Sequence, residues 1–297
     1  MKLSTSLVLA ALISSIGLSA HAEGRLDKIK STKTISLGYR DSSIPFSYLD
    51  GGKPVGYSKE ICDGIVKALE KQLGTELTVK QVPVTSASRI PLIMNGTIDL
   101  ACGSATNNAE RQKQVSFAPT TFVTATRFVS AKADNIKDLQ GFKGQTVTST
   151  AGTSNIKWLA ATNAKENLGM NIIPSKDHAG AFLTVQAGRA KAFFMDDVLL
   201  AGLVANSEDP EKWVISDKAL TTEPYAMIEP KDDPDFKKAV DDAVIAMIKS
   251  GEIEKLYKKW FESPIPPKNI NMNLPMSESL KKALANPTDS PDPAKYQ

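Results

Sequence analysis

Residues 98–112 of the chain read IDLACGSATNNAERQ and join a predicted buried strand to a predicted helix. The apolar first half follows Asn95-Gly96, a turn signal that is typical of the residues before a strand. The second half is small and polar until a helical run begins near Ala109, with Arg111 close behind. Hydroxyls, free backbone N–H groups and a guanidinium thus follow the carboxyl end of a strand, where open α/β sheets bind ligands. These donors suit a carboxylate or phosphate, although the same residues also fit an ordinary loop whose hydroxyls cap the helix.

The length and charge of the chain narrow the function classes. At 297 residues it is long enough for two domains with their own cores. Its formal net charge of +3 is spread along the sequence, which argues against a nucleic acid or an acidic membrane surface as partner. Only six of the 36 basic residues are arginines. Because arginine is preferred where a planar carboxylate is held by two hydrogen bonds, the scarcity of arginine makes the position of each one informative.

The first 22 residues are predicted to be a secretory signal peptide. Lys2 precedes an apolar run, and Ala20-His21-Ala22 fits the small-x-small cleavage rule. Cleavage there would release a soluble chain into the periplasm and leave His178 as its only histidine. A single histidine argues against a multi-histidine metal site, so we expect no metal and no cofactor. In an oxidising compartment Cys62 and Cys102 either form a disulfide or pack as two buried thiols.

Strands and helices alternate along the chain, which predicts an α/β fold. One helix is expected from Ser58, as its N-cap, to Leu73. Runs near 122–129 and 221–228 are interpreted as two crossings between two lobes, and the last dozen residues as a loose tail. Polar residues follow several of the predicted strands: Arg40, Ser86 with Arg89, Ser104 with Thr106, Thr153 with Ser154, His178, and Asp196.

Several segments in this order resemble one family, the exported solute-binding proteins of amino acid ABC transporters (family 3 extracellular solute-binding proteins). They are Pro45–Asp50 with Gly56-Tyr57, Asn95–Leu100, Gly152-Thr153-Ser154, Ala192–Asp196 and Lys231–Pro234. Within the family, a further set is most similar to glutamate/aspartate-binding proteins. These segments are Gly38–Ser43, Arg89–Leu92, Cys102–Gln112, Ser175–His178, Met195–Asp197 and Pro264–Asn269.

The resemblance implies a two-lobed type II periplasmic-binding-protein fold, in which helices flank a mixed sheet in each lobe. Lobe 1 would comprise 23–128 and 223–297, with a C-terminal arm, and lobe 2 would comprise 129–222. It also implies a monomer that captures L-glutamate or L-aspartate between the lobes and delivers it to a membrane permease. Three rival functions stay open: binding of another polar amino acid such as glutamine, an enzyme similar to cyclohexadienyl dehydratase, and a sensor partner that presents the bound amino acid to a receptor.

The resemblance further implies a role for each candidate residue. Arg111 and Thr106 would hold the α-carboxylate, assisted by Thr153 and Ser154 of the turn, and Asp196 would take the α-ammonium. The positive groups that select the ligand side chain would be Arg40, Arg89 and His178, with Ser86 and Ser104 beside them. The chain departs from the family where Ser58 replaces the usual aspartate. It also departs at Met227, near which some relatives have a cysteine that pairs with the counterpart of Cys102.

Overall fold

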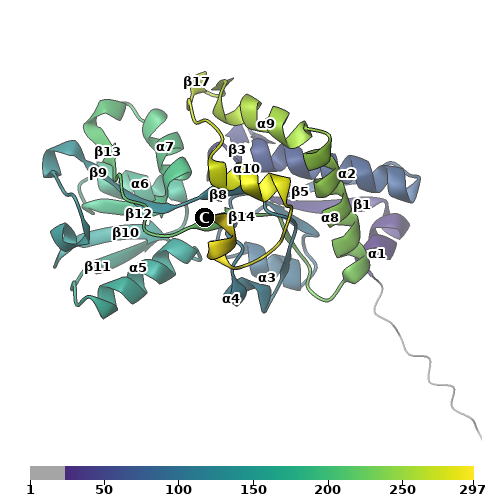
Figure 1. Ribbon diagram of the computed structural model, residues 1–297, viewed down its shortest axis with the longest axis horizontal. Helices are drawn as coiled ribbons and strands as arrows, with labels where there is room; N and C mark the ends of the chain where they lie inside the picture. Colours follow the sequence, from purple (N-terminus) through teal and green to yellow (C-terminus); the bar gives the residue numbers. More distant parts are fainter. Residues whose placement is uncertain (1–23) are drawn as a thin grey trace, which may run out of the picture.

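The computed structural model describes residues 24–297, so the predicted signal peptide lies outside the described residues. The α/β class is confirmed, because helices surround two separate five-stranded sheets (Figure 1). No helix within residues 24–297 combines the length and apolar character needed to span a bilayer.

The first sheet is mixed. Its strands, in spatial order, are β5 (Thr78–Pro83), β1 (Thr34–Tyr39), β6 (Leu100–Cys102), β15 (Ile228–Glu229) and β7 (Ser116–Phe117). β1 lies parallel to β5 and β6, whereas β15 runs antiparallel to both of its neighbours. The helices around this sheet are α1 (Arg25–Thr32), α2 (Tyr57–Leu73), α3 (Arg89–Met94), α4 (Ala109–Gln112), α8 (Pro234–Lys249) and α9 (Glu252–Phe261).

The second sheet repeats this arrangement. Its strands, in spatial order, are β11 (Asn171–Ser175), β10 (Thr146–Thr150), β12 (Ala192–Asp196), β9 (Thr126–Ala131) and β13 (Trp213–Ile215). β10 lies parallel to β11 and β12, and β9 is antiparallel to β12 and β13. Its helices are α5 (Ser154–Lys165), α6 (His178–Gln186) and α7 (Asp197–Ala205), with the short 3-10 helices η1 (Lys132–Asp134), η2 (Leu139–Phe142) and η3 (Pro210–Lys212).

Two short strands connect the sheets. β8 (Phe122–Thr124) and β14 (Glu223–Tyr225) pair antiparallel, with Phe122 opposite Tyr225. Both aromatic rings contact Phe46, and Phe122 also stacks on Phe261, so the ribbon is anchored in the core of the first sheet. The two predicted crossings therefore form one hydrogen-bonded hinge.

Small strands and a C-terminal arm complete the fold. A three-stranded sheet lies between β1 and α2, and the arm follows α9. These elements are β2 (Ser42–Ser43), β3 (Ser47–Asp50), β4 (Lys53–Val55), β16 (Pro264–Ile265), β17 (Ile270–Asn271), α10 (Glu278–Ala285) and the 3-10 helix η4 (Pro293–Tyr296). Figure 1 shows the arm, in yellow, lying across the β8–β14 hinge.

Two expectations about local structure are wrong. Ser58 is not the N-cap of α2, because the helix begins at Tyr57 and Gly56 occupies the cap with a φ of 129°. A Cβ on Gly56 would lie 2.4 Å from the Phe46 carbonyl oxygen, so the chain needs glycine there. The Ser58 hydroxyl is buried instead and donates to the Gly103 carbonyl at 3.1 Å.

The last dozen residues are also not a loose tail. Tyr296 is 1% exposed, and its hydroxyl accepts a hydrogen bond from Thr120 at 3.0 Å. The Thr120 N–H donates to the Thr288 carbonyl at 2.9 Å. Composition suggested disorder for this segment, but contacts with residues far away in the sequence order it.

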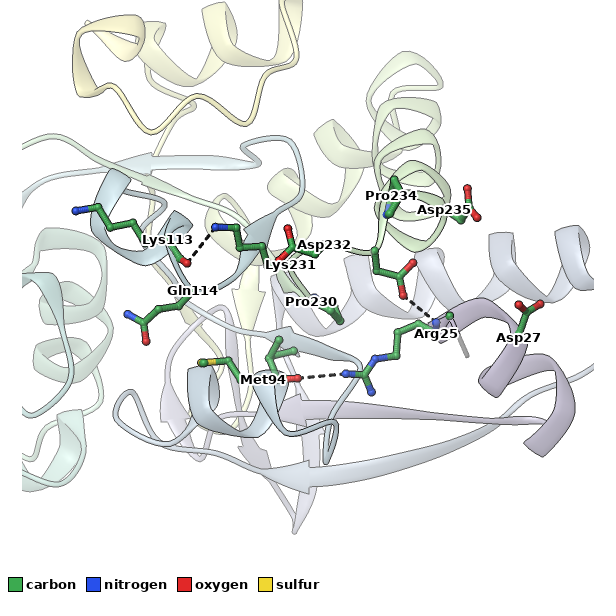
Figure 2. A pocket seen from close by; sticks show the side chains of 13 residues that line it. Arg25, Asp27, Met94, Lys113, Gln114, Pro230, Lys231, Asp232, Pro234 and Asp235 are labelled. Atoms are coloured by element: carbon green, nitrogen blue, oxygen red, sulfur yellow. Dashed lines mark hydrogen bonds between the residues drawn. The ribbon is translucent and has the colours of Figure 1, made fainter. Parts of the chain in front are cut away.

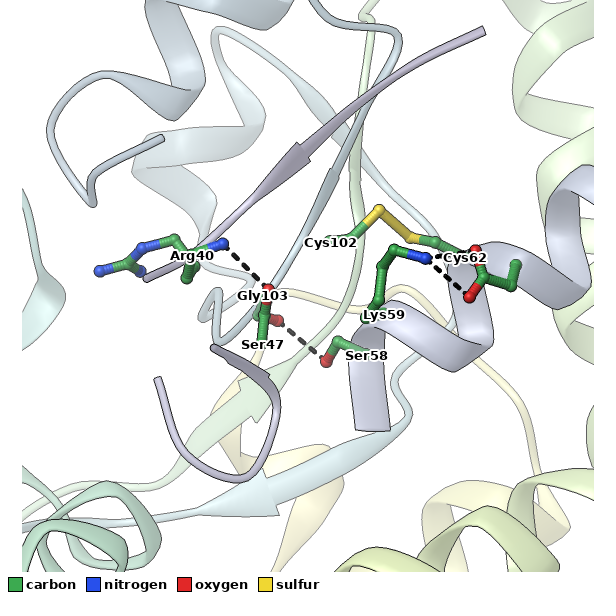
Figure 3. The surroundings of a disulfide bond; sticks show 8 residues. Arg40, Ser47, Ser58, Lys59, Cys62, Cys102 and Gly103 are labelled. Carbon is green, nitrogen blue, oxygen red and sulfur yellow. Dashed lines mark hydrogen bonds and ion pairs between the residues drawn. A yellow bond between two sulfur atoms is a disulfide. The ribbon is translucent and has the colours of Figure 1, made fainter. Parts of the chain in front are cut away.

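The two cysteines form a disulfide between α2 and the end of β6. Figure 3 shows the bond between Cys62 and Cys102, with Gly103 lying between Cys102 and Arg40 in this view. Both cysteines are buried. Of the two alternatives left by the sequence, the structure therefore has the disulfide.

Candidate functional site

Three parallel strands of the first sheet deliver polar groups to one edge. β1 ends at Tyr39, β5 at Pro83 and β6 at Cys102, and all three run in the same direction. The residues that follow them are Arg40, the loop 84–88 that leads into α3 at Arg89, and the loop that begins at Gly103. Because parallel strands end at a common edge, these loops converge there.

The second sheet does the same with β10, β11 and β12. β10 is followed by the turn at Gly152 and β11 by Asp177 with His178, and β12 ends at Asp196. Asp177 is the N-cap of α6, since its carboxylate accepts from the Gly180 N–H at 2.8 Å. Thr153 caps α5, since its hydroxyl accepts from the Ile156 N–H and donates to the Thr150 carbonyl.

Arg89 and two serines make up a first group of buried donors. The Arg89 Nη1 donates to the Ser104 carbonyl at 2.8 Å, and the Ser104 hydroxyl donates to Ser43 at 3.3 Å. Within residues 24–297, the Arg89 Nε and the Ser86 Oγ have no hydrogen-bond partner. The pKa of Arg89 is lowered well below its usual value, first by burial and then by the Arg111 and Arg40 charges. This cationic group therefore has free donors and lacks a matching anion.

Arg40 and His178 meet across the two sheets. The Arg40 Nη2 donates to the His178 Nε2 at 3.4 Å, and the Arg40 Nη1 has no partner within the described residues. Since a guanidinium only donates, Nε2 must be the bare ring nitrogen, and Nδ1 carries the hydrogen that it donates to Thr150 at 2.8 Å. Burial and the Arg40 charge lower the pKa of His178 well below 6.5. His178 therefore contributes a neutral imidazole, not the positive charge expected from the sequence.

Arg111 reaches across to the Gly152 turn. Its Nη1 donates to the Thr106 carbonyl at 2.7 Å and its Nη2 to the Gly152 carbonyl at 3.1 Å. The Thr106 and Ser154 hydroxyls lie 3.2 Å apart. Gly152 itself has a φ of 78°, and a Cβ there would meet the Ala87 backbone at 2.5 Å. These contacts bring together Arg111, Thr106 and Ser154, the residues expected to hold the α-carboxylate of the ligand.

Asp196 is the buried acid of the site. It accepts from the Asn155 amide at 2.7 Å and from the Tyr225 hydroxyl. Burial and the Glu223 carboxylate raise the pKa of Asp196 to about 7, whereas the two hydrogen bonds act in the opposite direction. The neighbouring Asp197 begins α7, accepts from the Val198 N–H and pairs with Arg127 at 3.2 Å. The structure thus gives the two adjacent acids different roles.

Five residues around the site were missed by the sequence reasoning. Glu223 accepts from the Ser154 hydroxyl at 2.8 Å, and Tyr225 and Asn155 hold Asp196. The other two are Ser43, beside Ser104, and Thr150, beside His178. Glu223 and Tyr225 belong to the predicted return crossing, so the hinge position itself was the signal that could have found them.

The charges of the site do not balance. Arg40, Arg89 and Arg111 contribute three positive charges, and Asp196 and Glu223 at most two negative ones, which leaves 3 − 2 = +1. Burial lowers the pKa of Arg40 to about 10 and also lowers that of Arg111. Buried unpaired charge is costly, so the site is suited to a ligand with net charge −1.

A separate surface pocket of about 770 Å³ does not contain any of the predicted residues. It lies between α1, the end of α3 and the start of α8, and its lining carries charges of both signs. Figure 2 shows Lys231 reaching the Lys113 carbonyl, and Arg25 among the other lining side chains. Within residues 24–297, no cluster of histidine, cysteine or acidic side chains could hold a metal ion.

Comparison with known proteins identifies the family of the chain. The family described as "Bacterial extracellular solute-binding proteins, family 3" matches residues 35–263. The chain belongs to this family. Among the relatives of this solute-binding protein is the L-glutamate/L-aspartate-binding protein of Pseudomonas aeruginosa, 50% identical over 97% of this chain and 96% of the relative. The glutamate/aspartate import solute-binding protein of Salmonella typhimurium is 46% identical over 97% of each chain.

Solved structures agree on the two-lobed type II fold. A mutant of the arginine-binding protein from T. maritima superposes with a TM-score of 0.71 at 27% identity, covering 80% of this chain and 99% of its own. An ancestral amino acid-binding protein, named as a precursor of cyclohexadienyl dehydratase, gives a TM-score of 0.67 at 27% identity over 80% and 99%. About a fifth of this solute-binding protein therefore has no counterpart in either structure.

Proposed function

We propose that this solute-binding protein binds L-glutamate or L-aspartate between its two lobes and passes it to the permease of an ABC-type importer. The observation that carries the proposal is the buried group of three guanidiniums with one excess positive charge. An acidic amino acid has two carboxylates and one ammonium, so its net charge of −1 matches that excess. The names of the relatives with 46–50% identity support the same ligand.

Each ligand group has a set of partners in this proposal. Arg111, Thr106 and Ser154 take the α-carboxylate, with the Thr153-capped helix start behind them. Asp196 takes the ammonium. The side-chain carboxylate goes to Arg40 and Arg89, because the Nη1 of Arg40 and the Nε of Arg89 are free to donate. The neighbouring groups on that side are the Ser86 hydroxyl, Ser104 and the neutral His178.

In this proposal lobe 1 comprises 23–128 and 223–297 and lobe 2 comprises 129–222, as the sequence suggests. β8 ends at Thr124 and β9 of the second sheet begins at Thr126, which supports a change of lobe close to the first of these boundaries. The protein acts as a monomer in the periplasm, after removal of the first 22 residues. When the lobes close on the ligand, they form the conformation that the permease recognises.

Calorimetric titration of the purified mature protein with a panel of amino acids tests the proposal. We expect L-glutamate or L-aspartate to bind tightest, with a Kd of about 1 µM or lower, a free energy near −8 kcal/mol. Tightest binding of a neutral or basic amino acid would contradict it. Turnover of arogenate or prephenate by the same sample would favour the dehydratase alternative instead.

A further inference from the structure

The C-terminal tail, residues 286–297, lies beyond the point at which the family match ends. It lies across the hinge, where η4 contacts β14 (Figure 1). It is also hydrogen-bonded to Asn107 and Gln112, in the segment that carries Thr106 and Arg111. Its position raises the question of whether it acts on the ligand site.

One backbone carbonyl oxygen of the tail accepts hydrogen bonds from the residues that follow Thr106 and Arg111. The Asp289 carbonyl accepts from the Asn107 side-chain amide at 2.7 Å and from the Gln112 amide at 2.8 Å. Asn107 directly follows Thr106, and Gln112 directly follows Arg111. The Asn107 side-chain oxygen also accepts from Gln112 at 2.9 Å, which closes a triangle of hydrogen bonds.

The tail is itself fixed at several points. Thr120 bonds to both the Thr288 carbonyl and the Tyr296 hydroxyl, and that hydroxyl donates to the Ser290 carbonyl at 2.8 Å. The Asp289 carboxylate pairs with Lys237 of α8 at 3.0 Å. The Asp289 carbonyl is therefore a stationary acceptor.

Asn107 connects this acceptor to the hinge as well. Its backbone N–H donates to the Pro224 carbonyl of β14 at 2.8 Å, and its side chain is 1% exposed. The segment Thr106–Gln112 is thus held by the hinge at one end and by the tail along its outer side. Without the tail, the Asn107 and Gln112 amides would lose their common acceptor and the loop would gain freedom that ligand binding must remove.

We propose that the C-terminal tail is a positioning element of the ligand site, which holds Thr106 and Arg111 in the geometry that grips the α-carboxylate. This inference rests on the proposed function. The tail has no contact with Arg40, Arg89 or His178 among the hydrogen bonds of the described residues. Its loss should therefore weaken every ligand that shares the α-carboxylate by a similar factor.

The test compares the mature chain with a chain that ends at Ala285 and with Asn107→Ala, Gln112→Ala and Tyr296→Phe. Asn107→Ala removes the hydrogen bond from the site loop to the Asp289 carbonyl. Tyr296→Phe removes only the hydroxyl that bonds to Thr120 and Ser290 and keeps the packing of the ring. Lys281→Ala is the matched control, because it removes an exposed charge on the same arm, facing Glu278. Each protein is titrated with L-glutamate and L-aspartate and its thermal unfolding is recorded.

We expect Kd to rise about tenfold for the truncated chain and about threefold to tenfold for Asn107→Ala, with the glutamate-to-aspartate ratio unchanged. Gln112→Ala and Tyr296→Phe should show smaller increases in the same direction, and Lys281→Ala none. If the truncated chain does not unfold cooperatively, it is not natively folded, and the inference is judged from the Kd values of the point variants alone.

A lower Tm with Kd within twofold of the unmodified chain in all variants would overturn the inference, because the tail would then serve stability alone. A changed ligand ratio would overturn it too, because the effect would then lie at the side-chain carboxylate. If the unmodified chain binds neither acid, the proposed function fails together with this inference. If it binds them and the variants bind equally well, only this inference fails.

Discussion

Arg89 is the residue in which burial and unmet hydrogen bonding coincide most clearly. Its side chain is 2% exposed, its Nη1 holds the Ser104 carbonyl, and its Nε faces no acceptor within residues 24–297. A buried guanidinium with a free donor binds a carboxylate through charge-assisted hydrogen bonds. The energetic consequence of removing it can be measured directly.

We expect Arg89→Ala to raise the Kd for L-glutamate by about 30-fold or more, because the loss of one partner of a buried charge pair costs about 2–5 kcal/mol. Arg89→Lys should recover only part of this loss, since an ammonium does not reproduce the planar fork. Calorimetric titration measures both. Arg189→Ala, at an exposed arginine, is the control, and an equal loss there would refute a specific role for Arg89.

Asp196 predicts a pH dependence of binding. In the closed structure its pKa is raised to about 7 by burial and by Glu223, so Asp196 holds a proton below that pH when the site is closed without ligand. An ammonium placed against it favours the carboxylate and lowers this pKa, so binding releases a proton and affinity rises with pH from about 5 to 7. Titrations in two buffers of different ionisation enthalpy measure the release. Proton uptake, or the same release from Asp196→Asn, would contradict the assignment.

At the scale of elements, the disulfide fixes α2 to β6 beside the site. It closes a separation of 40 residues, and Gly103 follows Cys102 directly. We expect the Cys62→Ala/Cys102→Ala variant to lose about 2–4 kcal/mol of unfolding free energy, because the unfolded chain gains conformational freedom. Urea denaturation under non-reducing conditions measures this. A loss below about 0.5 kcal/mol would show that α2 and β6 are held by packing alone.

The elements also show what could be predicted from sequence. The positions of Arg40, Arg89, His178 and Asp196 near the ends of strands could be predicted, because each strand and the polar residues at its end are encoded in one short stretch of sequence. Glu223 entered the site through hinge pairing with a strand about 100 residues away, which no local pattern encodes. The misassigned cap at Ser58 has the same cause, since the nearby Phe46 backbone, not the serine, determines how α2 begins.

At the scale of the whole molecule, the structure is a closed one in which the two lobes touch through the site. Arg40 meets His178, Arg111 meets Gly152, and Lys157 pairs with Glu110 at the exposed rim. Without an anion, closure brings three guanidiniums together in a buried space, which is unfavourable. Ligand should therefore shift the population towards this closed form.

We expect small-angle X-ray scattering to give a larger radius of gyration for ligand-free protein than for protein saturated with L-glutamate. An equal radius in the two states would refute ligand-driven closure. Lys157→Ala should leave both radii unchanged and alter Kd by less than about twofold, because an exposed ion pair contributes about 0–1 kcal/mol.

The order of strands in the first sheet has a consequence for biosynthesis. β15 lies between β6 and β7, yet the entire second sheet is translated before it. A nascent chain can assemble the contiguous strands from β9 to β13 while β6 still exposes an unpaired edge. The half of the molecule that begins the sequence is thus expected to be the half that finishes folding last.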